Sequence, residues 1–146
     1  MSNLLGDHVF TAVQAWTKES PETKAAYMDV AKNLPTLIRF NGLVTAVAFV
    51  RYKAIGKKSE GAKGLLKDLF ARKEDDARGF LTLGDLLQAP DAETGYQRLL
   101  QASGAAYRRM THIAMTQAEW FKRFAESELS NEPPSDVANL SDGGRA

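Results

Sequence analysis

The chain has 146 residues, no cysteine, and 19 Lys and Arg residues against 18 Asp and Glu residues. This length suggests one domain that can bury a core without cross-links. The lack of cysteine excludes disulfides, thiolate metal sites and thiol nucleophiles. No apolar run approaches the ~20 residues that span a bilayer, and residues 1–7 lack the basic and apolar parts of a signal peptide. We therefore expect a cytoplasmic protein that does not contact membranes.

Charge is unevenly distributed along the chain. The stretch from residue 39 to residue 67 contains one acid, Glu60, and a set of cations: Arg39, Arg51, Lys53, Lys57, Lys58, Lys63 and Lys67. From Asn131 onward, the sequence contains three acids and one cation, Arg145. A basic central third is compatible with an anionic partner, although a solvated helical face would give the same pattern.

Helical periodicity dominates the sequence, and no alternating strand pattern is present. A first helix is predicted over residues 4–18. Ser20 and Pro21 are typical of a helix start, so a second helix is predicted from there to about residue 33. Pro35 predicts a kink or restart, followed by a short helical piece over residues 36–40.

The Asn41-Gly42 pair favours a left-handed helix end. The next helix, residues 43–55, is apolar nearly all round in its first turns, which predicts a place in the middle of a bundle. Serine or threonine and aspartate caps predict the later helices: residues 60–73 after Ser59, a short helix between Thr82 and Pro90, one from residue 92 after Asp91, and residues 104–128 after Ser103.

Together these elements predict an all-α fold: a compact single-domain bundle of about five to seven helices over residues 1–129. The composition of residues 130–146 changes to Ser, Pro, Gly and acids, which predicts a disordered C-terminal tail.

No motif indicates catalysis, a metal site or a cofactor. His8 and His112 lack partners at metal-ligand spacing, and Gly61 to Gly64 lacks the spacing of a phosphate loop. The adjacent acids Asp75 and Asp76 diverge, as in a solvated turn. We therefore expect no catalytic residue, no metal and no cofactor.

Most aromatic residues recur at helical spacing and are expected in the core, whereas Tyr52, between two cations, remains open to base stacking. Residues 119–126 place Lys122 and Arg123 opposite an apolar face, and Arg108 lies upstream on the same predicted helix. This pattern predicts a second basic surface. Pairing of Glu119 with Arg123 is the simpler explanation, and the two do not exclude each other.

Two segments resemble the small subunit of the Cmr-type (type III-B) CRISPR effector complex. The first runs from Leu34-Pro35 through Asn41-Gly42 to Lys53, and the second contains Tyr107-Arg108 and residues 120–126. The resemblance covers roughly residues 20–128. It implies a helical, non-catalytic subunit that stacks into a filament beside backbone subunits holding a guide RNA, and that lines the channel where target RNA pairs with the guide.

The resemblance also implies partners and contact residues. The partners are target RNA, contacted through its backbone, the guide RNA–protein complex, the repeated (RAMP) backbone subunits, the large subunit and other copies of the chain. Family positions that are polar or basic correspond to Arg39, Asn41, Lys53, Arg108, Lys122 and Arg123. Charge alone adds Arg51, Lys57 and Lys58 to the candidate RNA-binding residues.

Three functional hypotheses follow. The first is a filament-forming RNA-binding subunit. The second is an assembly adaptor, or a type III-A small subunit, without direct RNA contacts. The third is an enzyme of unrecognised type, for which the sequence offers no candidate residues.

Overall fold

The computed structural model describes residues 4–56, 59–73 and 79–130. Within these ranges it contains seven helices and no strand. The helices are α1 (Leu4–Gln14), α2 (Pro21–Asn41), α3 (Leu43–Lys53), α4 (Glu60–Leu69), α5 (Leu83–Leu87), α6 (Ala92–Leu100) and α7 (Gly104–Glu128). The predicted all-α fold of five to seven helices is therefore confirmed. The predicted disordered tail lies outside the described residues, apart from Ser130.

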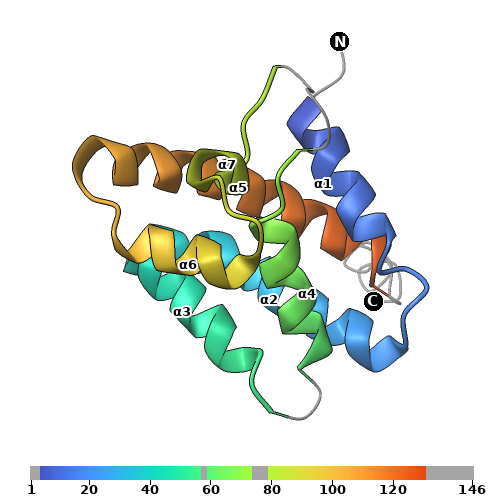
Figure 1. Ribbon diagram of the computed structural model, residues 1–146. Coiled ribbons are helices and arrows are strands. Elements are labelled where there is room, and N and C mark those ends of the chain that lie inside the picture. Colours follow the sequence, from blue (N-terminus) through green and yellow to red (C-terminus); the bar gives the residue numbers. More distant parts are fainter. Residues whose placement is uncertain (1–3, 57–58, 74–78, 131–146) are drawn as a thin grey trace, which may run out of the picture.

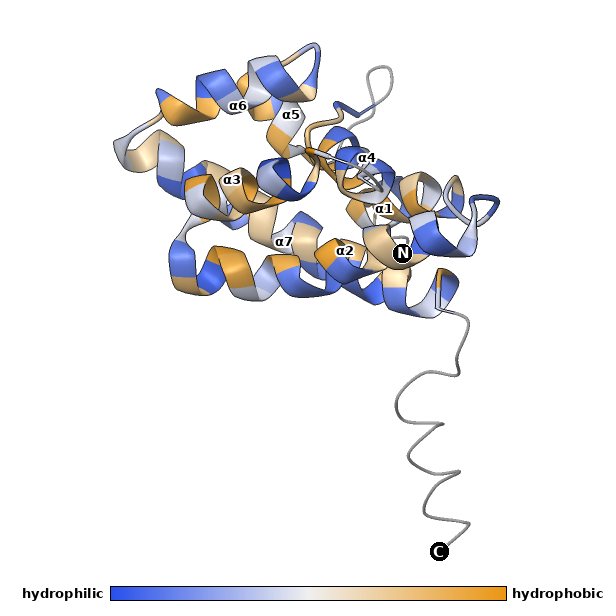
Figure 2. Cartoon of the chain, turned by 90° about the horizontal axis from the view of Figure 1, so that it is seen from below, coloured by the Kyte–Doolittle hydropathy of each residue, from blue (hydrophilic) through white to orange (hydrophobic). Residues whose placement is uncertain are grey.

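Helix α2 is the centre of the bundle, because it packs against α7, α4 and α3. Figure 1 shows α1 on one side of the α2–α4 pair, and α3 with α6 on the other. In Figure 2, hydrophilic and hydrophobic stretches alternate along α2 and α7, as expected of helices with one buried face. The prediction that residues 43–55 lie in the middle is wrong. Helix α3 lies at the side of the bundle and leaves Phe49 and Tyr52 exposed.

Capping signals in the sequence set several helix starts. In each of three caps the side chain accepts a hydrogen bond from a backbone N–H three residues later, and these caps are Ser20, Thr82 and Asp91. The other two predicted caps, Ser59 and Ser103, stand directly before α4 and α7 but make no side-chain capping bond. The predicted start of α7 is nevertheless the observed one.

Pro35 does not interrupt α2, so the predicted restart there, with a separate helical piece over residues 36–40, is wrong. Proline inside a helix removes one backbone hydrogen bond and costs about 3 kcal/mol. Here Pro35 is buried, and so are Leu34 and Ile38 on the same side of the helix. Burying each of these two side chains contributes about 1.5–3 kcal/mol, which offsets the cost of the proline.

Gly42 separates α2 from α3, as the Asn41-Gly42 pair predicts. Its φ of 87° lies in the region that favours glycine, and its N–H donates to the Ile38 carbonyl to close α2. The first turn of α3 is completed from α7, where the Tyr107 hydroxyl accepts a hydrogen bond from the Val44 N–H at 3.1 Å.

A half-buried polar cluster joins α2, and the turn before it, to α4. The Asp68 carboxylate accepts hydrogen bonds from Trp16 Nε1 at 2.9 Å and from the Tyr27 hydroxyl at 2.7 Å, and the two rings stack 5.0 Å apart. Gly64 gives the Trp16 ring its room, because a Cβ at this position would overlap the ring. Burial raises the pKa of Asp68 above its ordinary value, despite the opposing effect of these two hydrogen bonds.

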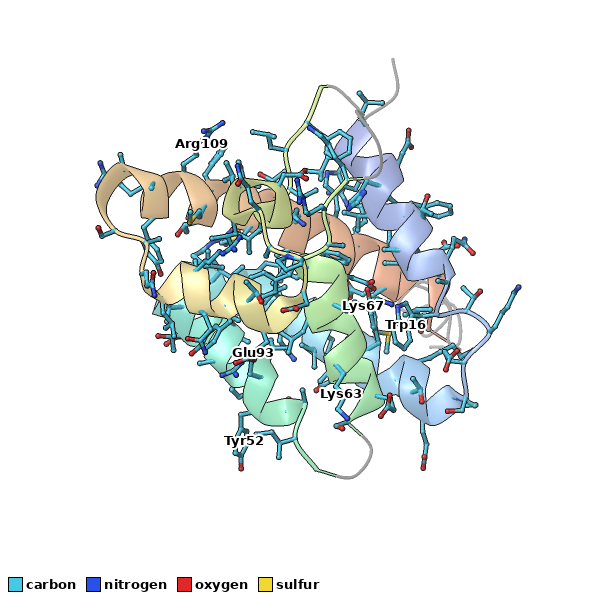
Figure 3. All side chains as sticks on the ribbon, viewed as in Figure 1. Trp16, Tyr52, Lys63, Lys67, Glu93 and Arg109 are labelled. Atoms are coloured by element: carbon cyan, nitrogen blue, oxygen red, sulfur yellow. The ribbon has the colours of Figure 1, made fainter. Side chains whose placement is uncertain are left out.

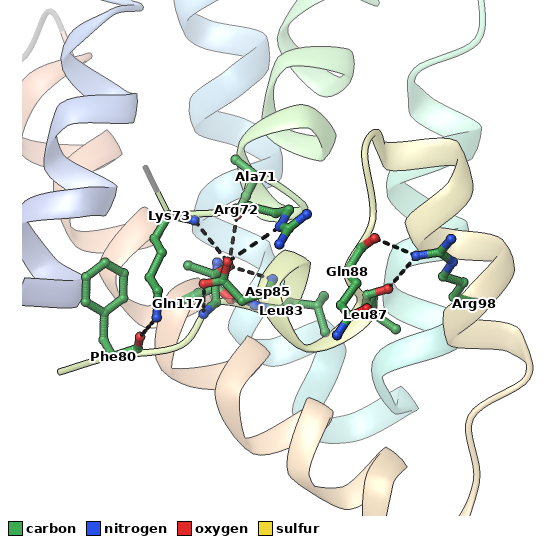
Figure 4. A network of polar contacts seen from close by, with 11 residues as sticks. Ala71, Arg72, Lys73, Phe80, Leu83, Asp85, Leu87, Gln88, Arg98 and Gln117 are labelled. Carbon is green, nitrogen blue, oxygen red and sulfur yellow. Dashed lines mark hydrogen bonds and ion pairs between the residues drawn. The ribbon is translucent and has the colours of Figure 1, made fainter. Parts of the chain in front are cut away.

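Gln117 is the second buried polar connection. Its amide oxygen accepts a hydrogen bond from the Leu83 N–H at 2.7 Å, and its amide nitrogen donates to the Leu69 carbonyl at 3.3 Å. Figure 4 shows Gln117 beside Leu83 at the start of α5. One side chain of α7 therefore holds the end of α4 and the start of α5.

The Asp68→Asn variant should change how stability depends on pH. Because the folded-state pKa of Asp68 is raised, the folded protein holds this proton to higher pH than the unfolded chain. The resulting stability is present at low pH and is lost as pH rises through the folded pKa. Asparagine keeps an accepting oxygen and cannot ionise. Urea unfolding between about pH 3 and pH 7 should show the variant gaining stability relative to the wild type as pH rises. A difference that is constant across pH contradicts this.

The Gln117→Met variant should be destabilised, because it leaves the Leu83 N–H and the Leu69 carbonyl buried without partners. Each unsatisfied group costs roughly 1–3 kcal/mol. Gln101→Met is the matched control, since Gln101 is exposed at the end of α6. Urea unfolding should separate the two variants, and equal midpoints would contradict a structural role for Gln117.

Candidate nucleic-acid interface

Three of the predicted cations lie on the outer side of α7. Arg108, Lys122 and Arg123 are exposed, and none forms an ion pair with another described residue. Arg108 and Arg123 are about 22 Å apart along the helix, at ~1.5 Å per residue. The Arg123 guanidinium also packs against the Trp120 ring, 5.1 Å from its centroid. This side of the bundle therefore presents cations whose charge is not neutralised.

Arg39 joins these cations from the neighbouring helix. It lies 3.9 Å from Glu119 of α7, and the two side chains are 63% and 56% exposed. An exposed pair at this distance contributes about 0–1 kcal/mol, so Arg39 is available to other anions. We call the surface formed by Arg39, Arg108, Lys122 and Arg123 the α7 face.

Asn41 lies at the edge of the α7 face. It is exposed as the last residue of α2, and the next residue, Gly42, approaches the Tyr107 hydroxyl in the first turn of α7. Asn41 is therefore close to the end of the α7 face that carries Arg108.

Arg51 and Lys53 lie elsewhere, and both are paired with acids. One guanidinium nitrogen of Arg51 donates to both carboxylate oxygens of Glu93, at 2.7 and 3.0 Å, and Arg51 stacks 4.1 Å from the centroid of the Tyr96 ring. Lys53 donates to Asp29 at 2.9 Å. The predicted cations therefore divide into two groups, and the α3 group is electrostatically neutralised.

The Arg51–Glu93 contact stabilises the charged form of both groups. The hydrogen bond raises the pKa of Arg51 above its ordinary value. The same bond, supported by Gln97, lowers the pKa of Glu93. A phosphate that approaches Arg51 would therefore meet a guanidinium whose charge is already paired with a carboxylate.

Some candidates were missed or lie outside the described residues. Lys57 and Lys58 lie outside the described residues, so their role in RNA binding stays a prediction. Lys32 is exposed on α2 seven residues before Arg39, and His112 is exposed on α7 four residues after Arg108. Both spacings place the residue on the same helix side as a predicted cation, a signal that could have identified them from the sequence.

The described residues show no metal-binding group and no helix that could span a membrane. No group of three His, Asp or Glu side chains in the described ranges could hold a metal ion. None of the helices described is long and apolar enough to cross a membrane.

Comparison with known proteins identifies relatives over most of the chain. The family model for the CRISPR-associated protein Cas_Cmr5 matches residues 5–128. The CRISPR system Cmr subunit Cmr5 of Thermus thermophilus is 35% identical over 106 residues, which cover 73% of this chain and 77% of the relative.

A solved structure agrees with the family match. The crystal structure of a CRISPR-associated Cmr5 family protein from Thermus thermophilus is similar with a TM-score of 0.65 and 29% identity. The similarity covers 87% of this chain and 97% of that one.

Glu119 should limit anion binding by the α7 face, because it is the acid closest to Arg39 on that face. Glu119→Gln should therefore bind heparin more tightly and elute at higher salt. Glu19→Gln is the matched control: it makes the same charge change at an exposed residue that forms no ion pair in the described part of the chain. Equal elution of the two variants would show that the α7 face does not bind the polyanion.

Proposed function

The chain belongs to the Cas_Cmr5 family, the small subunits of the type III-B (Cmr) CRISPR complex, and we propose that it acts there as a non-catalytic filament subunit whose α7 face contacts target RNA. The observation that carries the RNA contact is the set of unpaired cations along α7 with Arg39 beside them. This combination supports contact with the phosphate backbone of a strand.

The α7 face is suited to binding without sequence preference. Its cations form charge-assisted contacts to phosphates, and phosphate contacts position a strand without reading its bases. In guide-directed complexes the guide reads sequence by base pairing, so a protein beside the duplex needs only backbone contacts. Exposed cations spaced along one long helix meet that requirement.

The proposed partners follow from membership of the complex. They are target RNA, the guide RNA–protein complex, the backbone subunits, the large subunit and further copies of this chain. Such a complex would operate in the cytoplasm as part of antiviral defence. In this assignment cleavage and signalling chemistry belong to other subunits.

The second candidate is an assembly adaptor without RNA contacts. The paired cations of α3 favour this role for the α3 side of the molecule. Arg51 and Lys53 already bind Glu93 and Asp29 within the chain. Their side of the molecule is therefore better suited to protein than to a polyanion. The sequence-based assignment of Lys53 to phosphate contact is accordingly not retained in the proposal.

Neutralising the α7 face should weaken target-RNA binding by the assembled complex. The Arg108→Gln, Lys122→Gln, Arg123→Gln triple variant removes three contacts, which should reduce the slope of log affinity against log salt by up to about 2, at ~0.7 per phosphate. Titration of the purified complex with labelled target RNA at several salt concentrations measures this slope.

The Arg51→Gln, Lys53→Gln variant is the control for this experiment. It should leave the salt slope unchanged, because both cations are already paired. An unchanged slope for the triple variant would contradict the RNA contact. Loss of the chain from the purified complex, with no RNA present, would instead support the adaptor.

A further inference from the structure

We propose that the ring of Phe40 is a stacking site for an unpaired base of the strand that the α7 face contacts. This inference rests on the proposed function and adds to it a contact with a base, because the cations of the α7 face are suited to phosphates alone. Bases inside a duplex are covered on both sides by their neighbours. The ligand is therefore a nucleotide of single-stranded RNA, whose base is free to lie on a protein ring.

Phe40 carries an uncovered ring in the last turn of α2. Its side chain is 76% exposed. Among the residues that the structure describes, it takes part in no ring–ring contact and no cation–π contact. A single exposed aromatic residue is ordinary on a protein surface, so exposure alone does not identify a site. The neighbours of Phe40 decide what the ring can bind.

Two cations of the α7 face lie near Phe40. Arg39 directly precedes it, is 63% exposed and approaches Glu119 only to 3.9 Å, so its charge is available to a phosphate. The turn after Phe40 lies beside the start of α7, where the Val44 N–H donates to the Tyr107 hydroxyl at 3.1 Å and where Arg108 follows.

The geometry of the helix lets one nucleotide reach both a cation and the ring. Consecutive residues of an α-helix are about 100° apart around its axis. Arg39 and Phe40 are both exposed, so they lie next to each other on the outer surface of α2. A nucleotide whose phosphate meets Arg39 can therefore direct its base over Phe40.

The surroundings of Phe40 are polar, which favours a nucleotide over a protein as the ligand. Thr36, Arg39 and Asn41 are exposed beside it on α2, and Leu37 is half-buried. The core of a protein interface is apolar, whereas this ring stands among polar side chains. Aromatic rings beside cations are typical of surfaces that bind single strands.

Tyr52 provides the comparison within the same molecule. Its side chain is 75% exposed, and the cations on either side of it in the sequence make it a candidate for base stacking. Both of these cations pair with acids of the chain, Arg51 with Glu93 and Lys53 with Asp29. A strand that approached Tyr52 would therefore gain little attraction from them.

Tyr52 also lies among apolar side chains. It lines an open groove of about 400 Å³ together with Ala48, Ala54 and Ile55, and Ile55 is 76% exposed. Figure 3 shows Tyr52 pointing outward at the edge of the molecule. Exposed apolar side chains gathered in this way resemble a protein contact. Base stacking is therefore better suited to Phe40 than to Tyr52.

Two strands that differ only in their bases test the stacking. Oligouridine and an abasic strand of the same length carry the same phosphates, and the full chain is titrated with each at low salt. The wild type should bind oligouridine at least about fivefold more tightly, because stacking on one ring changes affinity roughly five- to 150-fold. Phe40→Leu should lose this preference, while its affinity for the abasic strand and its salt slope stay unchanged.

Two variants are the controls for this experiment. Tyr52→Leu removes an equally exposed ring and should keep the preference for oligouridine. Phe40→Trp supplies another stacking surface and should keep it as well. Leucine preserves an apolar side chain at position 40, so a loss in Phe40→Leu reports the ring itself. Both leucine variants replace exposed residues and should unfold at the same urea concentration as the wild type.

Each other result overturns the inference. Equal binding of both strands by the wild type would show that no base is stacked, and the phosphate contact would stand if both affinities still fell with salt. A preference that survives in Phe40→Leu would place the base elsewhere, on α3 if Tyr52→Leu abolishes it. Loss of Phe40→Leu from the purified complex, with the preference intact, would assign Phe40 to a protein contact. Binding of neither strand would contradict the proposed RNA contact together with the stacking.

Discussion

The arrangement of the bundle depends on how α2 is fixed against α4 and α7. Tyr27 and Trp16 both donate hydrogen bonds to the half-buried carboxylate of Asp68, and this fixes the register of α2 against α4. A carboxylate buried without a cation is costly, and only good hydrogen bonds make it tolerable. The cluster therefore defines one packing of α4 on α2 at some expense in stability. The fixed position of α2 also determines where Arg39 lies beside α7.

The two sets of cations differ in what they touch, and this difference separates two kinds of surface in one small protein. On α3, Glu93 and Asp29 supply the counter-charge from within the chain. On α7, exposed cations keep their charge for an external anion, apart from the loose contact of Arg39 with Glu119. Because the α3 cations pair with acids of the same chain, exposed apolar side chains determine the character of the surface at α3. At α7, unpaired cations determine it. The proposed role, in which the chain contacts both protein and RNA, requires these two kinds of surface.

Much of the fold could be predicted from local signals. The Ser20-Pro21 start, the Thr82 and Asp91 caps and the turn at Gly42 each depend on neighbouring residues, and the structure contains all of them. The restart predicted at Pro35 is absent because burial of Pro35 and its neighbours outweighs the local cost of the proline. The candidate site was less predictable: Arg51 pairs with an acid 42 residues away in the sequence, and no local pattern reveals such a partner. The family resemblance suggested candidate basic positions but could not show which of them pair with acids of the same chain.

The uninterrupted course of α2 has a mechanical consequence. This helix has 21 residues and, at ~1.5 Å per residue, a length of about 32 Å along its axis, with Arg39 beside α7 and Asp29 bound to Lys53 of α3. Packed helices move as units because their cores do not deform continuously. A strand bound along α7, as proposed above, would then shift the whole protomer without bending it. In the proposed filament, this rigid-body shift would displace the neighbouring copies as well. Cooperative binding along a row of protomers would then arise because one bound protomer aligns the next with the strand, without any refolding.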